Sequence, residues 1–346
     1  MVEPVYIAGV GSCLPGTPVD SASLAKALGV DPDWVETYIG TRTRHFVRDP
    51  ATGEARWSLA DLCARAADRA MQDAGLEPSD VEFAVLATAT PDALMPATVN
   101  QAAEQLGLNL LPTYQLQSGC AGAIQALDLA AGLLACGRHR VGLVLGGDVC
   151  AKHLDPFAAA AGGLGSLSPG ELVGYLVFGD GAGAAVVTAQ PAGRAWALRR
   201  VLNRLTGAGR EPGQTVEWYG AADRDRGPQA PRPVREDYKA IEQSVPAMAA
   251  EIVWELLDDL GWRAEDLDYV LPPQLSARMT PRVVEQLGVP AAAEVSCVAD
   301  TGNTGNALPF LQLERLAGVI RPGQRALAVA VESSKWIKAG LALEAA

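Results

Sequence analysis

The second half of the chain repeats the first, and this internal repeat restricts the possible folds more than any other feature. Residues 81–148 and 267–333 both begin with a short apolar run and continue into a helical pattern ending in Glu-Gln-Leu-Gly, at 104–107 and 285–288. An extended run, a glycine-rich turn, an amphipathic helix and a buried strand follow in both. The repeat predicts two related α/β halves, 1–190 and 191–346, that meet near residues 188–200.

In this register Cys120, within "QSGCAGAIQAL", is the counterpart of Asn303, within "GNTG". Both lie where a strand turns into a helix, and two such helix starts can face each other across one cleft. Unpaired N–H groups and the helix dipole at these positions lower a thiol pKa, so we expect a thiolate nucleophile at Cys120. An inert packed thiol remains the alternative for Cys120, and a turn or cap residue remains the alternative for Asn303.

Composition and charge exclude several classes of protein. Of the 346 residues, 49% are apolar and 20% charged, with no apolar run long enough to span a membrane and no basic segment typical of a signal peptide. We therefore expect a cytoplasmic protein without a membrane partner. The net charge of −12 makes a nucleic-acid partner improbable. The six cysteines are scattered without a CxxC pair, so no metal, cofactor or disulfide framework is expected.

Two glycine clusters, "VYIAGVGSCLPG" and "FGDGAGAAVV", superficially resemble nucleotide-binding loops. Such a loop needs a strand, then glycines, then a helix. Pro15 stops a helix after the first cluster, and "AAVV" after the second is typical of another strand. We interpret the glycines as allowing tight turns and close backbone approach.

The repeat, "SGCAG", "FGDGAGAAVV" and "GNTG" together resemble the thiolase-fold condensing enzymes, in particular β-ketoacyl-acyl-carrier-protein synthase III. The likeness extends from "VYIAGVGSCLPG" through "DWVETYIGTRTRH" to "AGLAL". It implies a thiolase-like α/β fold, with two pseudo-symmetric halves in a five-layered αβαβα arrangement. In this family a cysteine takes the acyl group from a thioester. A histidine and an asparagine hydrogen-bond the malonyl thioester as it loses carbon dioxide. Cys120 matches the nucleophile and Asn303 the asparagine.

The sequence departs from this family at the histidine. The family motif "PHQAN" corresponds here to "LPPQLSAR", which places Pro273 at the histidine position and Ser276 at a second asparagine position. Proline has no side-chain donor or acceptor, so the second catalytic group of a decarboxylating enzyme is absent. His153, in "GGDVCAKHLDPF", is a candidate substitute base, with a surface-loop histidine as the alternative.

The resemblance also implies substrate-binding residues and partners. Trp34 matches a tryptophan that stacks on the adenine of coenzyme A, and Arg278 matches an arginine of that site. Tyr38 replaces the arginine that neighbours this tryptophan, so a carrier-protein thioester is favoured as donor over acyl-coenzyme A. Phe178 and Ser276 are assigned to the substrate pocket. Met95 is expected to reach into the partner's acyl pocket in a homodimer.

A long excursion at residues 203–237 is rich in glycine, proline and charge. It is expected on the surface, either over the substrate entrance or without a role.

Three hypotheses for function follow. The first is an acyltransferase of secondary-metabolite, polyketide-type biosynthesis that passes an acyl group from Cys120 to an alcohol, amine or thiol of a small-molecule acceptor. The second is a decarboxylating synthase that forms a carbon–carbon bond. The third is an inactive subunit that shapes a heterodimer, which the intact "SGCAG" disfavours.

Overall fold

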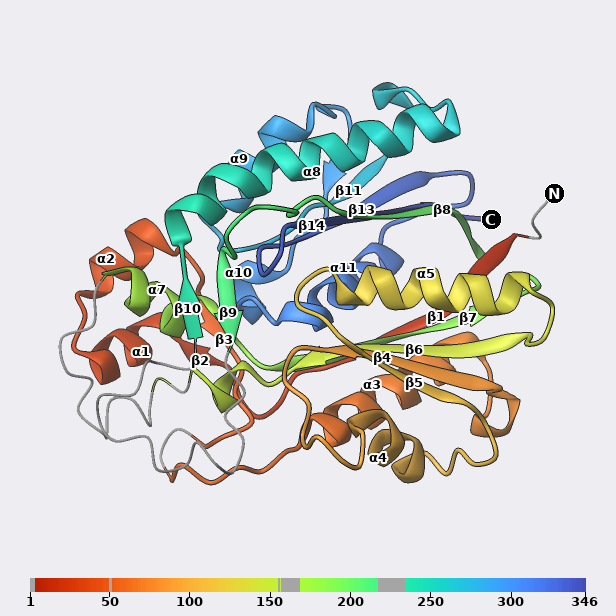
Figure 1. Cartoon of the computed structure of the whole chain (residues 1–346), viewed down its shortest axis with the longest axis horizontal. Helices are drawn as coiled ribbons and strands as arrows, with labels where there is room; N and C mark the ends of the chain where they lie inside the picture. The colour runs from red at the N-terminus through yellow and green to blue at the C-terminus, as the bar shows by residue number, and fades with distance from the viewer. Residues whose placement is uncertain (1–3, 50–51, 155, 157–168, 217–233) are drawn as a thin grey trace.

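A computed structural model describes residues 4–346 except 50–51, 155, 157–168 and 217–233 (Figure 1). Its strands are β1 (Val5–Cys13), β2 (Val19–Asp20), β3 (Thr43–Arg44), β4 (Phe83–Thr88), β5 (Thr113–Gln117), β6 (Val141–Asp148), β7 (Gly181–Thr188), β8 (Trp196–Leu205), β9 (Gln214–Val216), β10 (Val234–Glu236), β11 (Tyr269–Leu271), β12 (Ala293–Glu294), β13 (Arg325–Glu332) and β14 (Ile337–Glu344). Its α-helices are α1 (Ser21–Leu28), α2 (Pro32–Tyr38), α3 (Leu59–Ala74), α4 (Thr98–Gln105), α5 (Gly122–Ala135), α7 (Pro169–Val177), α8 (Tyr238–Leu260), α9 (Thr280–Leu287), α10 (Val298–Thr301) and α11 (Leu308–Ala317). Short 3₁₀ turns are η1 (Pro78–Asp80), η2 (Cys150–Lys152), η4 (Ala264–Asp266) and η5 (Gly305–Ala307).

The strand order repeats the duplication seen in the sequence. The main sheet runs β12-β11-β13-β14-β8-β1-β7-β6-β4-β5. Outward from the β1–β8 junction, the two sides read β1-β7-β6-β4-β5 and β8-β14-β13-β11-β12. In both, the first three strands pair antiparallel and the last three pair parallel. The expected junction near residues 188–200 lies between the end of β7 and β8.

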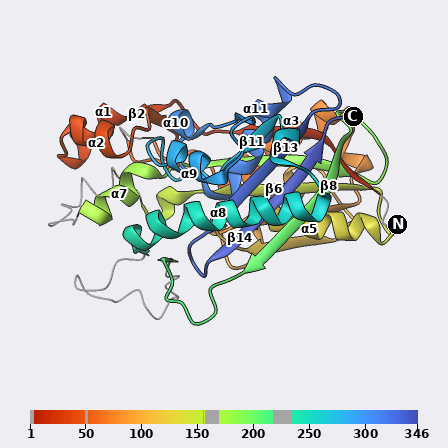
Figure 2. The same ribbon diagram turned by 90° about the horizontal axis from the view of Figure 1, so that it is seen from above.

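Helices separate and cover the two sides of this sheet (Figure 1). The central layer is α5 with α11, whose Ile124, Leu127, Phe310 and Leu313 share one buried apolar cluster with strands of both sides. The outer layers are α3 with α4 on one side and α8 with α9 on the other, and Figure 2 shows α8 lying over β14. The predicted five-layered arrangement is confirmed.

Helix α3 shows why one glycine cluster is needed. The helix begins with a capping box, in which Ser58 Oγ accepts a hydrogen bond from Asp61 N at 3.0 Å and the Asp61 carboxylate accepts one from Ser58 N at 2.8 Å. It then packs tightly on β1. A Cβ added to Gly11 would lie 2.6 Å from the carbonyl oxygen of Ala66, which real Cβ atoms do not tolerate. The glycines of "VYIAGVGSC" therefore allow close helix–strand packing.

In the part of the chain described here, no helix combines the length and the apolar character needed to cross a membrane. The same residues contain no group of three or more His, Cys, Asp or Glu side chains placed to hold a metal ion.

Candidate active site

Cys120 lies in the tight loop between β5 and α5. Gly122 N donates to the Gly119 carbonyl at 2.8 Å, and the Cys120 side chain is half-buried between two cavities. Gly119 and Gly122, beside Cys120, have no room for a side chain because Glu332 and Asn306 pack against them. A Cβ on Gly119 would lie 3.1 Å from the carboxyl carbon of Glu332, and one on Gly122 would lie 2.5 Å from Oδ1 of Asn306. The loop therefore leaves no room for larger side chains beside the sulfur.

Asn303 lies in the corresponding loop of the second half, between α10 and η5. Its Oδ1 accepts a hydrogen bond from Gly305 N at 3.0 Å, while its backbone N donates to Val177 O at 2.9 Å. No described residue accepts a hydrogen bond from Asn303 Nδ2. Asn303 and Cys120 both line one cavity, so the two loops related by the repeat meet there, with an amide N–H available beside the thiol.

Hydrogen bonds of Asp148 and Asn306 connect the Cys120 loop with the Asn303 loop. The Asp148 carboxylate accepts hydrogen bonds from Ala89 N at 2.7 Å and Thr88 Oγ1 at 3.1 Å, and from Asn306 N at 2.8 Å. Asn306 Nδ2 donates to Asp148 Oδ2 and to the Ser118 carbonyl, both at 2.9 Å. Burial raises the pKa of Asp148, and these donors oppose the rise. Sequence reasoning missed both residues, although they follow "GG" and "GNTG" in the repeat.

The expected thiolate at Cys120 is wrong for the resting site. Burial raises the pKa of the Cys120 thiol to about 12, and the carboxylates of Glu332, Asp148 and Glu236 add to the rise. Glu332 is held close because its carboxylate accepts hydrogen bonds from Ser118 Oγ, at 2.9 Å, and from Ser334 Oγ. Burial, the largest contribution, and these three carboxylates together outweigh the favourable end of α5. Acyl transfer at neutral pH must therefore begin with removal of the thiol proton by a base.

The first cavity, which we call the inner cavity, is lined by Cys120, Asn303 and the loop after β11. Pro273 forms part of its wall. The amide of the neighbouring Gln274 is held toward Cys297: its Oε1 accepts from Cys297 N and Val298 N, both at 2.7 Å, and its Nε2 lies 3.9 Å from Cys297 Sγ. Gln312 Nε2 is likewise occupied by backbone carbonyls. Among the described side chains of this wall, Asn303 offers an amide donor without a partner, whereas Gln274 Nε2 makes one long contact, 3.9 Å, with Cys297 Sγ.

The second cavity, the outer cavity, opens on the other side of Cys120. Its walls include Phe178, His153 and Cys150, together with Gln214 and Val216 of β9 and Val234 of β10. The described ends of the 203–237 excursion therefore border the thiol, while residues 217–233 lie outside the described chain. Phe178 forms a backbone bridge with Asn303, which ties the walls of the two cavities together.

His153 reaches this outer cavity with an unused ring nitrogen. Its Nε2 is buried and has no partner among the described residues. Burial lowers the pKa of His153, and the neighbouring Lys152 lowers it further, so the imidazole is neutral at pH 7. The location is compatible with the substitute base expected from the sequence, and that role stays a prediction.

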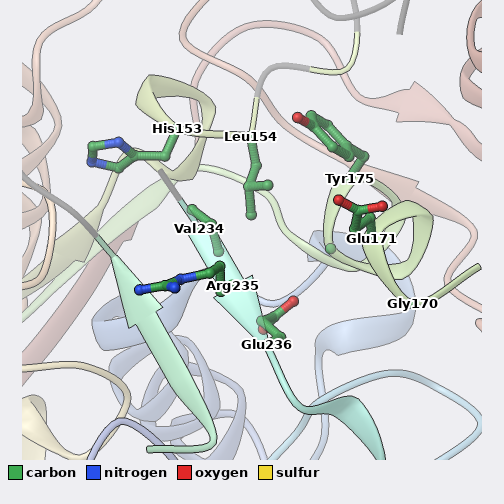
Figure 3. A pocket seen from close by; sticks show the side chains of 9 residues that line it. His153, Leu154, Gly170, Glu171, Tyr175, Val234, Arg235 and Glu236 are labelled. Atoms are coloured by element: carbon green, nitrogen blue, oxygen red, sulfur yellow. The ribbon is translucent and has the colours of Figure 1, made fainter. Parts of the chain in front are cut away.

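A third cavity of about 260 Å³, the polar pocket, adjoins the outer cavity (Figure 3). The two share His153, Leu154 and Val234. Glu171 and Tyr175 of α7, and Arg235 and Glu236 of β10, supply its polar groups. Sequence reasoning missed this pocket, because β10 lies in a charged excursion that carries no motif.

Other expected substrate residues lie away from the walls of these cavities. Trp34 stacks against Tyr38 with ring centroids 5.1 Å apart, and the Arg278 guanidinium is held by the Glu36 carbonyl at 3.0 Å. These side chains form one surface of α2 and the loop before α9. Ser276 is buried, and its Oγ accepts from Met279 N at 3.2 Å, so it caps the turn into α9 and contributes to neither wall beside Cys120.

Met95 is 86% exposed and its neighbour Leu94 is 70% exposed. Both belong to the loop between β4 and α4, on the side of the sheet where β5 forms the edge strand. Met95 contributes to none of the three cavities of its own chain.

Comparisons with known families agree with the fold. Residues 114–202 match the family "3-Oxoacyl-[acyl-carrier-protein (ACP)] synthase III", and residues 257–335 match its C-terminal domain. Residues 40–154 match the thiolase N-terminal domain. The β-ketoacyl-[acyl-carrier-protein] synthase III 3 of Streptomyces coelicolor is 30% identical over 341 residues, which cover 95% of this chain and 94% of that protein.

Two solved structures are similar over nearly the whole chain. A tetronic acid condensing enzyme, AbyA1, is 53% identical with a TM-score of 0.92, over 98% of this chain and 99% of that one. The priming β-ketosynthase of the R1128 polyketide pathway is 27% identical with a TM-score of 0.83, over 99% of this chain and 96% of that one. The thiolase-like fold expected from the sequence is confirmed.

Proposed function

The chain belongs to the 3-oxoacyl-acyl-carrier-protein synthase III family, whose members use acyl-carrier-protein or acyl-coenzyme A donors. We propose that Cys120 takes an acyl group from such a donor and passes it to an acceptor without decarboxylation. In the first step a base removes the Cys120 thiol proton and the sulfur attacks the donor thioester. The new carbon–sulfur bond forms, the donor carbon–sulfur bond breaks, and the donor thiolate takes up the proton as it leaves. Asn303 Nδ2 is the hydrogen-bond donor for the oxyanion. In the second step an acceptor displaces Cys120.

The observation that carries this proposal is the wall of the inner cavity. Decarboxylation of a malonyl thioester places negative charge on an enolate oxygen, and loss of one oxyanion donor typically lowers the rate by about 10²–10³. Pro273 supplies no donor, and the Gln274 amide is turned toward Cys297 and Val298, with Oε1 accepting from both backbone N–H groups and Nε2 3.9 Å from Cys297 Sγ. Transfer of an acyl group that is already activated as a thioester requires one oxyanion site and a base for the acceptor.

For the acceptor we favour a hydroxyl group over an amine or thiol. The structural relative with 53% identity is described as a tetronic acid condensing enzyme. A tetronic acid is a five-membered lactone, so its ring contains an acyl–oxygen bond, and an acyltransferase to oxygen can form that bond. The setting we propose is polyketide-type secondary metabolism.

For the donor we favour a carrier-protein thioester. Tyr38 packs against the ring of Trp34, and Arg278 is engaged by Glu36 through a backbone hydrogen bond and a 3.5 Å ion pair. Both groups that the resemblance assigns to coenzyme A are therefore partly occupied within the chain.

The second candidate is a decarboxylating synthase. The names of the Streptomyces coelicolor relative and of the priming ketosynthase favour it. The two functions are separated by one assay with acyl-loaded enzyme and carboxyl-labelled malonyl-carrier protein. We expect acyl-Cys120 to be consumed by an alcohol acceptor without release of labelled carbon dioxide. Release at the rate of product formation would support the decarboxylating function instead.

A further inference from the structure

Glu236 is a carboxylate that the reaction outlined above does not yet use. It ends β10, is half-buried, and lines the polar pocket beside His153, Leu154 and Val234, which also line the outer cavity of Cys120. Figure 3 places the carboxylates of Glu171 and Glu236 on one side of this pocket, and the side chains of His153 and Arg235 on the other.

The Glu236 carboxylate is held with one oxygen occupied and one free. Gln214 Nε2 donates to Oε1 at 2.7 Å, and Gln214 itself lines the outer cavity with Cys120. No described residue donates to Oε2. This oxygen would lie 3.0 Å from a Cβ added to Gly174, so a glycine at that position leaves it accessible to the pocket. A group that enters from the Cys120 side thus meets an oriented, open acceptor.

The surroundings of Glu236 tune it to act near neutral pH. Removal from water raises its pKa to about 7, and the hydrogen bond from Gln214 limits the rise. A base works best when its pKa is close to the operating pH. The negative charge of Glu236 also raises the pKa of the Cys120 thiol. The titratable and charged groups that face it are Cys120, Cys150, His153, Glu171, Tyr175, Arg235 and Tyr238.

We propose that the polar pocket receives a hydroxylated acceptor and that Glu236 is the general base for its attack on acyl-Cys120, an inference that rests on the proposed function. The acceptor oxygen bonds to the acyl carbon while its proton passes to Oε2 of Glu236. The carbon–sulfur bond then breaks, the ester leaves, and the Cys120 sulfur takes a proton back from Glu236 or from water. His153 is the competing base, because it lines both cavities and its Nε2 has no partner among the described residues. We favour Glu236 because the hydrogen bond from Gln214 orients its carboxylate.

The experiment compares wild type with Glu236→Gln, which preserves shape and the contact with Gln214. Cys120 is first loaded with acetyl from acetyl-carrier protein, and its decay is followed by intact mass with glycerol as the alcohol probe. Hydroxylamine, which needs no base, is used in parallel. We expect equal loading, equal decay in hydroxylamine and at least about a 10²-fold slower transfer to glycerol in Glu236→Gln. In wild type this transfer rises with pH around 7, and the variant lacks that rise.

Glu104→Gln, on the exposed side of α4 and outside all three cavities, is the matched control, and we expect its transfer rate within about threefold of wild type. Equal transfer to glycerol by wild type and Glu236→Gln would overturn the role of Glu236 and leave the proposed function intact. Failure of wild-type Cys120 to load, or failure of the loaded enzyme to use an alcohol, would overturn the proposed function itself. Loss of hydroxylamine reactivity in Glu236→Gln would also contradict the inference, since it indicates a disturbed site.

Discussion

Asn306 donates a hydrogen bond from Nδ2 to Oδ2 of Asp148 at 2.9 Å, and this contact joins the two halves of the duplicated chain beneath Cys120. The same amide reaches the Ser118 carbonyl, two residues before the nucleophile. The position of the thiol therefore depends on a polar contact between segments that are far apart in the sequence.

Replacing Asn306 should loosen the site. Asn306→Ala removes two buried hydrogen bonds and leaves Asp148 and Ser118 O short of donors, so we expect a loss of about 1–3 kcal/mol in the free energy of unfolding and slower acyl loading. Chemical denaturation and intact mass measure the two effects. Asn203→Ala, which removes a similar hydrogen bond to Asp128 on the exposed face of β8, is the control and should leave loading unchanged. Normal loading by Asn306→Ala would contradict the inference that the Asn306 hydrogen bonds to Asp148 and Ser118 position Cys120.

Cys120 should be essential for loading yet slow to alkylate at neutral pH. Cys120→Ala removes only the sulfur from a tight loop, so the fold should persist while acyl loading is lost. Because its thiol pKa is raised to about 12, iodoacetamide should modify Cys120 more slowly at pH 8 than the exposed Cys136, and the rate at Cys120 should still increase above pH 9. Peptide mapping by mass spectrometry gives both rates. A Cys120 rate that no longer changes above pH 7 would indicate a resting thiolate.

Pro273→His should introduce the missing donor into the inner cavity. A histidine here would stand beside Asn303 and supply the second hydrogen bond to an enolate oxygen. We expect release of labelled carbon dioxide from malonyl-carrier protein to increase by about 10-fold or more. Leu275→His, in the same wall, is the control for adding an imidazole at the wrong position. Equal release from the two variants would mean that the position of Pro273 has no special importance.

Glu236→Gln should also change how stability depends on pH. The carboxyl pKa is raised from its ordinary range near 4.5 to about 7, so between these values the folded chain keeps a proton that the unfolded chain loses. Stability from this group is full below pH 4.5 and falls as pH rises to about 7. The variant should be roughly 1–2 kcal/mol more stable than wild type at pH 8, after allowance for the open side of the pocket, with no such gain at pH 4. Denaturant unfolding at both pH values tests this, with Glu104→Gln of α4 as the control.

The exposure of Met95 favours a homodimer, and sedimentation can measure this assembly directly. Two exposed apolar side chains, Leu94 and Met95, lie in the loop between β4 and α4, and β4 is the neighbour of the edge strand β5. Burial against a second copy would remove both side chains from water. We expect a homodimer at micromolar concentration in sedimentation, weakened at least 10-fold by Met95→Glu. Val319→Glu, half-exposed after α11, should not weaken it. A wild-type monomer at these concentrations would refute the prediction.

Much of the fold could be predicted from the sequence because its signals are local and occur twice. The order of apolar runs, helical patterns and glycine turns predicts two equivalent halves, and equivalence places Cys120 and Asn303 at matching turns. Pro273 could be recognised as a departure only through the resemblance to the synthase III family, whose motif "PHQAN" corresponds to "LPPQLSAR" here. The glycines of β1 were correctly interpreted as packing positions, because Pro15 excludes a following helix.

The electrostatics of the site depend instead on tertiary structure. The helix-start argument for Cys120 considered only its own loop, whereas Asp148, Glu236 and Glu332 approach the thiol from β6, β10 and β13. Likewise, nothing near Glu236 in the sequence indicates that it shares a pocket with His153, more than eighty residues earlier. Periodicity and turn chemistry determine which elements form and how each half is ordered. Distances between charges, and the removal of water around them, are set only when distant segments pack together. These distances and this burial decide whether Cys120 rests as a thiol and which group can take the proton of the acceptor hydroxyl.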